Sequence, residues 1–111
     1  MSWYITIRSD SCYGCTIDPD RITAFLRTLP ELVQTGVNTF AGAPGYPWVS
    51  ITLAMSDQGS YVDRGVRLAA VNLVDIVCSY DHAESGYEAL ASRLAAFLDW
   101  EALHEHAERT V

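Results

Sequence analysis

The clearest pattern in the chain is an alternation of apolar and smaller or polar residues from Trp48 to Met55. Period-two alternation is typical of a β-strand with one buried face. A second apolar run extends from Val66 to Tyr80, and from Val71 onward it is apolar on both faces, which predicts an inner strand covered on both sides or nearly so. Because the intervening residues 56–65 are polar and include two glycines, the two runs are predicted to form a long hairpin.

A helix is predicted to begin at Asp18-Pro19-Asp20, where Asp18 can cap the first amides and Pro19 suits the first helical position. Its apolar stripe has helical spacing and comprises Ile22, Phe25, Leu26 and Leu29. Pro30 should end or kink the helix, and an extra turn can follow over Glu31–Thr35.

A second helix is predicted to start between Ala83 and Gly86. Its buried stripe would comprise Tyr87, Leu90, Ala91, Leu94, Phe97 and Leu98. The segment Asp99–Leu103 is expected to continue this helix or to form a short second piece, since Trp100 and Leu103 need a surface to pack against.

Two further strands are predicted at Trp3–Arg8 and Val37–Ala41. The resulting order is β-α-β-β-β-α, an α+β fold in one domain spanning residues 1–111. Short connections favour an antiparallel sheet with the first strand paired alongside and both helices packed on one face.

The net charge of the chain indicates which kinds of partner it can bind. The 111 residues carry a net charge of −7, and all seven cations are arginines, with no lysine. Such a surface repels phosphate backbones, so no nucleic-acid binding is expected, and it would attract a basic protein. The alternative is that the acidity serves solubility alone. No apolar run reaches the length of a membrane span and no signal core is visible, which predicts a cytoplasmic protein that does not bind membranes.

Cys12 and Cys15 have the spacing of a redox or zinc pair. The predicted helix cap, Asp18, lies beyond them, so the pair is expected in a loop rather than at a helix start. Zinc would need two more ligands, for which His104 and His106 are available. The alternative is a plain loop, and neither a metal nor another cofactor is expected.

His82 lies beside Asp81 and Glu84 and could act as a base, but no motif places a nucleophile to use it. The alternative is that the same residues form the start of a helix, with acidic groups in its first turn. Asp75 interrupts an apolar strand and is expected to be exposed or paired with an arginine; an isolated buried carboxylate would be a functional candidate. We therefore do not expect an enzyme.

Aromatic and acidic residues are interleaved in the predicted loops and at strand ends, a composition typical of protein-binding surfaces. The candidate partner-binding residues are Asp10, Tyr13, Tyr46, Trp48, Asp57, Tyr61, Asp63 and Asp81.

The chain resembles the small acidic α+β immunity proteins of bacterial polymorphic and contact-dependent toxin systems. The resemblance lies in the segments Ala43–Val49, Val71–Tyr80 and Phe97–Glu101 and in the general shape of the whole chain. It implies stoichiometric inhibition of a cognate toxin, often with acidic groups facing a basic cleft.

Three hypotheses follow. The first is a non-catalytic protein that binds a basic partner, such as a cognate toxin, through its acidic and aromatic loops. The second is a small zinc- or thiol-dependent protein that uses Cys12 and Cys15. The third is a self-associating structural subunit with Trp3–Arg8 as an exposed edge strand, so both a monomer and a homodimer are open.

Overall fold

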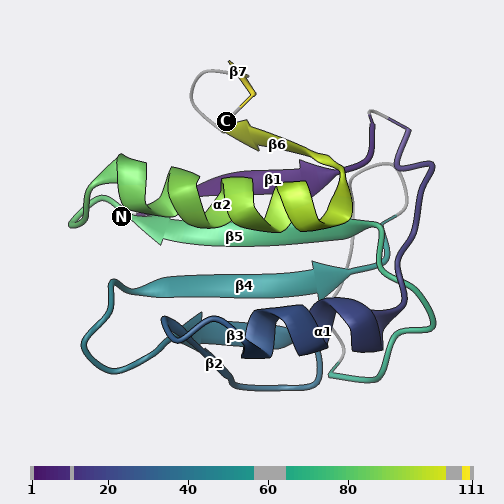
Figure 1. Ribbon diagram of the computed structural model, residues 1–111, viewed down its shortest axis with the longest axis horizontal. Coiled ribbons are helices and arrows are strands. Elements are labelled where there is room, and N and C mark those ends of the chain that lie inside the picture. Colours follow the sequence, from purple (N-terminus) through teal and green to yellow (C-terminus); the bar gives the residue numbers. More distant parts are fainter. Residues whose placement is uncertain (1, 11, 57–64, 105–108, 111) are drawn as a thin grey trace.

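The computed structural model describes residues 2–10, 12–56, 65–104 and 109–110. They form one antiparallel sheet and two helices, so the predicted α+β class is confirmed (Figure 1). The strands are β1 (Ser2–Arg8), β2 (Leu32–Gln34), β3 (Thr39–Gly42), β4 (Val49–Ala54), β5 (Leu73–Ser79), β6 (Glu101–His104) and β7 (Arg109–Thr110). The helices are α1 (Pro19–Arg27) and α2 (Glu84–Leu98).

The strands lie in the order β2-β3-β4-β5-β1-β6-β7, and every pair of neighbours is antiparallel. The predicted hairpin is the β4–β5 pair, in which Ile51 lies opposite Ile76. Its second strand is shorter than predicted, because β5 begins only at Leu73. Just before it, the Asn72 side chain accepts a hydrogen bond from the Ser56 amide and donates one to the Ser56 carbonyl. These bonds hold together the two ends of the β4–β5 connection.

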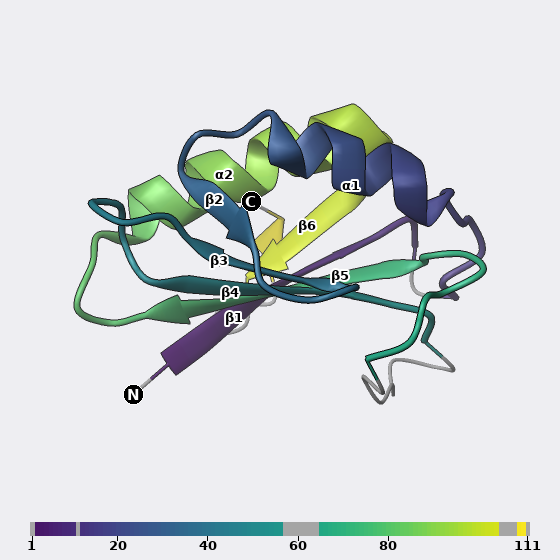
Figure 2. The same cartoon turned by 90° about the horizontal axis from the view of Figure 1, so that it is seen from below.

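Both helices lie on the same side of the sheet (Figure 2). Phe25 of α1 stacks on Phe97 of α2 with ring centroids 4.1 Å apart, which joins the two helices. Alternate strand residues point toward the helices and form the core, as period-two patterning requires. The largest fully buried side chains are Trp3, Ile5, Ile7, Ile22, Leu26, Phe40, Ile51, Leu53, Val71, Val74, Ile76 and Leu94.

The opposite face of the sheet corrects the prediction that the inner strand is covered on both sides. Asp75, Val77 and Ser79 of β5 point away from the helices and are only partly buried. Asp75 lies between Thr52 of β4 and Thr6 of β1. It is therefore a partly buried residue of the open face and not an isolated buried carboxylate.

The start of α1 is as predicted: Asp18 is the N-cap, and its carboxylate accepts a 2.9 Å hydrogen bond from the Asp20 amide. The extra helical turn predicted over Glu31–Thr35 is wrong, because Leu32–Gln34 forms β2. A few residues after a proline are too short to nucleate a helix, whereas pairing with β3 satisfies their backbone groups.

The prediction that α2 continues through Asp99–Leu103 is also wrong. Asp99 adopts the left-handed conformation, with φ 58°, and the Trp100 amide donates to the Ala95 carbonyl at 3.0 Å. This closure ends the helix and turns the chain back into β6. A left-handed residue at the end of a helix is usually glycine, so an aspartate at this position only weakly predicts that the helix ends there.

β6 pairs with β1, which places β1 between β5 and β6. The expectation of an exposed edge at Trp3–Arg8 is therefore wrong for Ile5–Arg8, which pairs with β6, and the self-association hypothesis stays a prediction. Across the described residues, no helix is long and apolar enough to cross a membrane.

Candidate functional site

One end of the sheet brings together two loops, residues 43–48 between β3 and β4 and residues 80–83 between β5 and α2 (Figure 1, left). They meet because Val49 pairs with Cys78 at the ends of β4 and β5. The hydroxyl of Tyr87 on α2 joins them: it donates a hydrogen bond to the Trp48 carbonyl and accepts one from the Ser79 amide at 3.3 Å. Tyr87 is thus a fixed support beneath both loops.

The surroundings of the Tyr87 hydroxyl keep it protonated, so that it can donate a hydrogen bond. Burial raises the pKa of its phenol above the ordinary value, and the neighbouring Cys78 and Asp81 act in the same direction. The bond from the Ser79 amide opposes them without reversing the shift. The phenol therefore stays protonated through the neutral range.

A pocket of about 260 Å³ opens between the two loops and α2. Its lining residues are Glu31, Tyr46, Pro47, Val49, His82, Ala83, Gly86, Tyr87, Leu90 and Arg93. An ion pair of 2.8 Å between Glu31 and Arg93 stands among them. The volume lies slightly below the range of small-molecule sites, about 300–1,000 Å³, and suits a single inserted side chain.

Large aromatic side chains are exposed on the two loops that flank this pocket, and Tyr46 among them lines it. Trp48 is 52% exposed, Tyr46 48% and Tyr80 45%. Asp81 is exposed beside them, and Glu84 opens α2 with a further carboxylate. We call Tyr46, Trp48, Tyr80 and Asp81, with the pocket, the loop-end surface.

Asp10 and Tyr13, the other predicted partner-binding residues that the structure describes, are not part of the loop-end surface. Asp10 and Tyr13 lie in the loop after β1, at the opposite end of the sheet. There the Asp10 carboxylate accepts hydrogen bonds from the amides of Cys12 and Gly14, at 2.8 and 3.3 Å, which gives it a structural role in that turn. Asp57, Tyr61 and Asp63 lie outside the described residues. The eight candidates therefore do not form one patch.

Tyr13 also has a structural role. Its backbone is left-handed, with φ 55°, and the Arg8 guanidinium lies 5.5 Å from its ring centroid. Arg8 in turn pairs with Glu101 of β6 at 2.9 Å. Burial works against the charge on Arg8, but hydrogen bonds with Tyr13 and Glu101 raise its pKa above the ordinary value.

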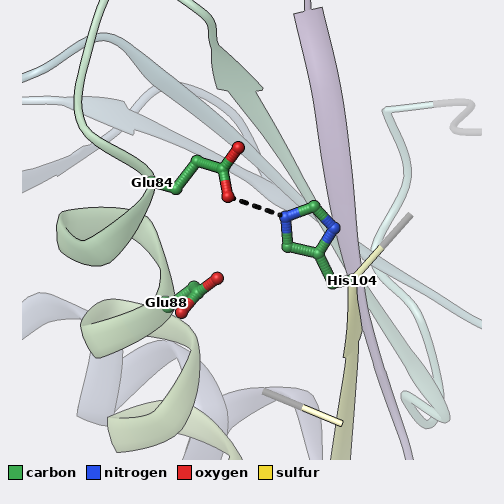
Figure 3. A group of neighbouring side chains, drawn as sticks. All are labelled: Glu84, Glu88 and His104. Carbon is green, nitrogen blue, oxygen red and sulfur yellow. Dashed lines mark ion pairs between the residues drawn. The ribbon is translucent and has the colours of Figure 1, made fainter. Parts of the chain in front are cut away.

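The cysteine pair lies in the same loop, as predicted, with Cys12 and Cys15 exposed as free thiols before the α1 cap. Within the described ranges, neither cysteine belongs to a group of three side chains with metal-ligand spacing. His104, considered as a further ligand for them, lies instead on β6 against α2 (Figure 3). His106 lies outside the described residues.

His104 forms a cluster with Glu84 and Glu88 that the sequence reasoning missed. Ligand atoms from the three residues all lie within 4.8 Å of one another, and His104 Nε2 is 3.4 Å from a carboxylate oxygen of Glu84 (Figure 3). The i, i+4 spacing of the glutamates was a readable signal, since it places both on one helix face. The histidine was not readable, because its position requires β6 to pair with β1.

No family model, curated protein or solved structure matches this chain. The resemblance to immunity proteins stays a prediction.

Proposed function

We propose that this protein is a non-catalytic binding module that engages a basic protein partner through the loop-end surface. The observation that carries the proposal is that Tyr46 lines a side-chain-sized pocket and that Trp48 and Tyr80 belong to the two loops that flank it, all three side chains being about half exposed. Tyrosine and tryptophan dominate the energetics of protein interfaces because each buries a large area at low conformational cost.

The support beneath these residues favours tight binding. The Tyr87 hydroxyl holds the Trp48 backbone and the end of β5 in one geometry before any partner arrives. A surface ordered in advance loses less conformational entropy on association. The pocket can then receive one anchoring side chain of the partner.

Charge favours a basic partner. Asp81 and Glu84 lie at this end of the molecule, and Arg93, which also lines the pocket, is paired with Glu31. The chain as a whole carries a net charge of −7. Complementary charge speeds the encounter and suppresses acidic competitors. Inhibition of a basic cognate toxin, as the resemblance suggests, is one form that this binding would take.

The experiment is a pull-down from lysate of the source organism, with the protein as bait and washes of graded salt. The expected result is a basic protein retained at one-to-one stoichiometry and released as the salt concentration rises. The isolated partner is then titrated against two bait variants, Trp48→Ala and Asp81→Asn. Trp48→Ala should weaken binding by at least about 30-fold, as expected of an interface hot spot worth about 2 kcal/mol. Asp81→Asn should slow association at low salt.

Met55→Ala is the matched control, because Met55 is 50% exposed but lies at the opposite end of β4. Equal losses for Trp48→Ala and Met55→Ala would show that the loop-end surface is not the interface. If the Asp10→Asn, Tyr13→Ala double variant lost binding and Trp48→Ala bound as well as the parent protein, the interface would lie at the other end of the sheet.

A further inference from the structure

The cluster of Glu84, Glu88 and His104 lies between α2 and β6, apart from the residues that line the loop-end pocket (Figure 3). We propose that these three residues bind a divalent transition-metal ion, with zinc as the probe. The proposal does not rest on the partner-binding function, although Glu84 also adds negative charge at that end of the molecule, and it departs from the expectation that the protein uses no metal.

The donor set suits zinc. Imidazole nitrogen and carboxylate oxygen are both common zinc ligands, with bonds of about 2.0–2.2 Å, and three protein ligands with one open position form a known type of zinc site. The two glutamates come from one helix face and the histidine from a neighbouring strand. Ligands from two packed elements converge without needing a flexible loop.

The distances fit a shared ion. Two bonds of about 2.0–2.2 Å at a tetrahedral angle separate their donor atoms by about 3.3–3.6 Å. His104 Nε2 and the nearer Glu84 oxygen are 3.4 Å apart, whereas a charge-assisted hydrogen bond brings such atoms to about 2.7–2.9 Å. Ligand atoms of all three residues already lie within 4.8 Å, and rotation about glutamate side-chain torsions can close the remaining separation.

The histidine is held in place before an ion arrives. His104 is 3% exposed, and its ring stacks on the Trp3 indole with centroids 4.5 Å apart and an interplanar angle of 21°. Trp3 is itself buried and meets the Tyr87 ring edge-on at 5.8 Å. Packing therefore fixes the imidazole plane with Nε2 toward Glu84 (Figure 3). The Glu84 side chain is 52% exposed, so an ion can enter from solvent.

The competing reading is a plain Glu84–His104 ion pair without a metal. Calorimetric titration with zinc distinguishes the two readings. The starting protein should carry Cys12→Ser and Cys15→Ser, which removes the exposed thiols as a zinc site. We expect this protein to bind one equivalent of zinc and to melt at a higher temperature with zinc than without it. Cobalt should give the visible absorption bands of a four-coordinate ion.

Glu84→Gln and Glu88→Gln in the same background should each weaken zinc binding by at least about tenfold, and the double variant should abolish it. These substitutions keep side-chain size and leave the buried His104 in place, so the fold is expected to survive. His82→Gln is the control for a surface histidine and should leave the affinity unchanged. Absence of zinc binding by the folded cysteine-free protein would overturn the proposal, as would full binding by the Glu84→Gln, Glu88→Gln variant.

Discussion

The Tyr87 hydroxyl donates a hydrogen bond to the backbone carbonyl of Trp48, which lies 39 residues earlier in the chain. One helix side chain thereby fixes the loop that carries the most exposed aromatic residue at the loop-end surface. The same oxygen accepts a hydrogen bond from the Ser79 amide, so Tyr87 is bonded to both loops.

Replacement of Tyr87 by phenylalanine should lower the free energy of unfolding by about 1–2 kcal/mol. The ring and its packing are kept, but the Trp48 carbonyl and the Ser79 amide each lose a partner. Urea denaturation measures the change. Tyr46→Phe, which removes a hydroxyl from a half-exposed ring, serves as the control and should change the stability by less than about 0.5 kcal/mol. Equal stability of Tyr87→Phe and the parent protein would contradict the support role.

Tyr87 also predicts an alkaline limit to stability. Its pKa is raised by burial, above an ordinary value of about 10. Below that pH the phenol is protonated in both states and contributes its full stability. Above it the unfolded state releases the proton first, so the free energy of unfolding falls until the native phenol also ionises. Denaturation midpoints measured from pH 8 to 11 should fall less steeply for Tyr87→Phe than for the parent, and parallel curves would contradict the assignment.

Asp99 should be a position where glycine stabilises the protein. Its φ of 58° is a conformation that glycine adopts without strain, whereas a side chain there costs energy. Asp99→Gly should raise the free energy of unfolding by about 0.5–1 kcal/mol, while Asp99→Ala should lower it. Thermal melts of the two variants test the opposite signs. A lower melting temperature for Asp99→Gly would mean that the aspartate side chain contributes more than its backbone strain costs.

Asn72→Ala should lower the free energy of unfolding by about 2 kcal/mol, because the amide and carbonyl of the buried Ser56 lose the two hydrogen bonds that the Asn72 side chain makes with them. Asn72→Asp keeps the acceptor but loses the donor, and it should also be destabilising. Ser50→Ala on the open face of β4 is the control and should be close to neutral. Denaturant unfolding supplies the measurement, and a cost for Asn72→Ala within about 0.5 kcal/mol would contradict the bridging role.

Patterning predicted the regular elements well where they carry their own signal. The alternation after Trp48 marks β4, and the Asp18-Pro19 start with its apolar stripe marks α1. Short strands were missed because three or four residues hold too little periodicity. Leu32–Gln34 and Glu101–His104 are strands because β3 and β1 lie beside them.

The candidate site was also only partly predictable from the sequence. Aromatic and acidic loop residues could be named from composition, but whether they share a surface depends on which end of the sheet each loop occupies. Tyr46, Trp48 and Asp81 belong to the two loops at one end of the sheet, whereas Asp10 and Tyr13 lie at the other end and stabilise their own turn.

The sequence by itself determined the α+β class, the start of α1, the β4–β5 hairpin and the excess of negative charge. All of these follow from local periodicity, helix caps and composition. The tertiary structure alone decided that Tyr87 supports Trp48 and that His104 lies against Glu84 and Glu88. Both relationships join residues far apart in the chain, and they depend on strand order and on the reversal at Asp99, for which local sequence carries almost no signal.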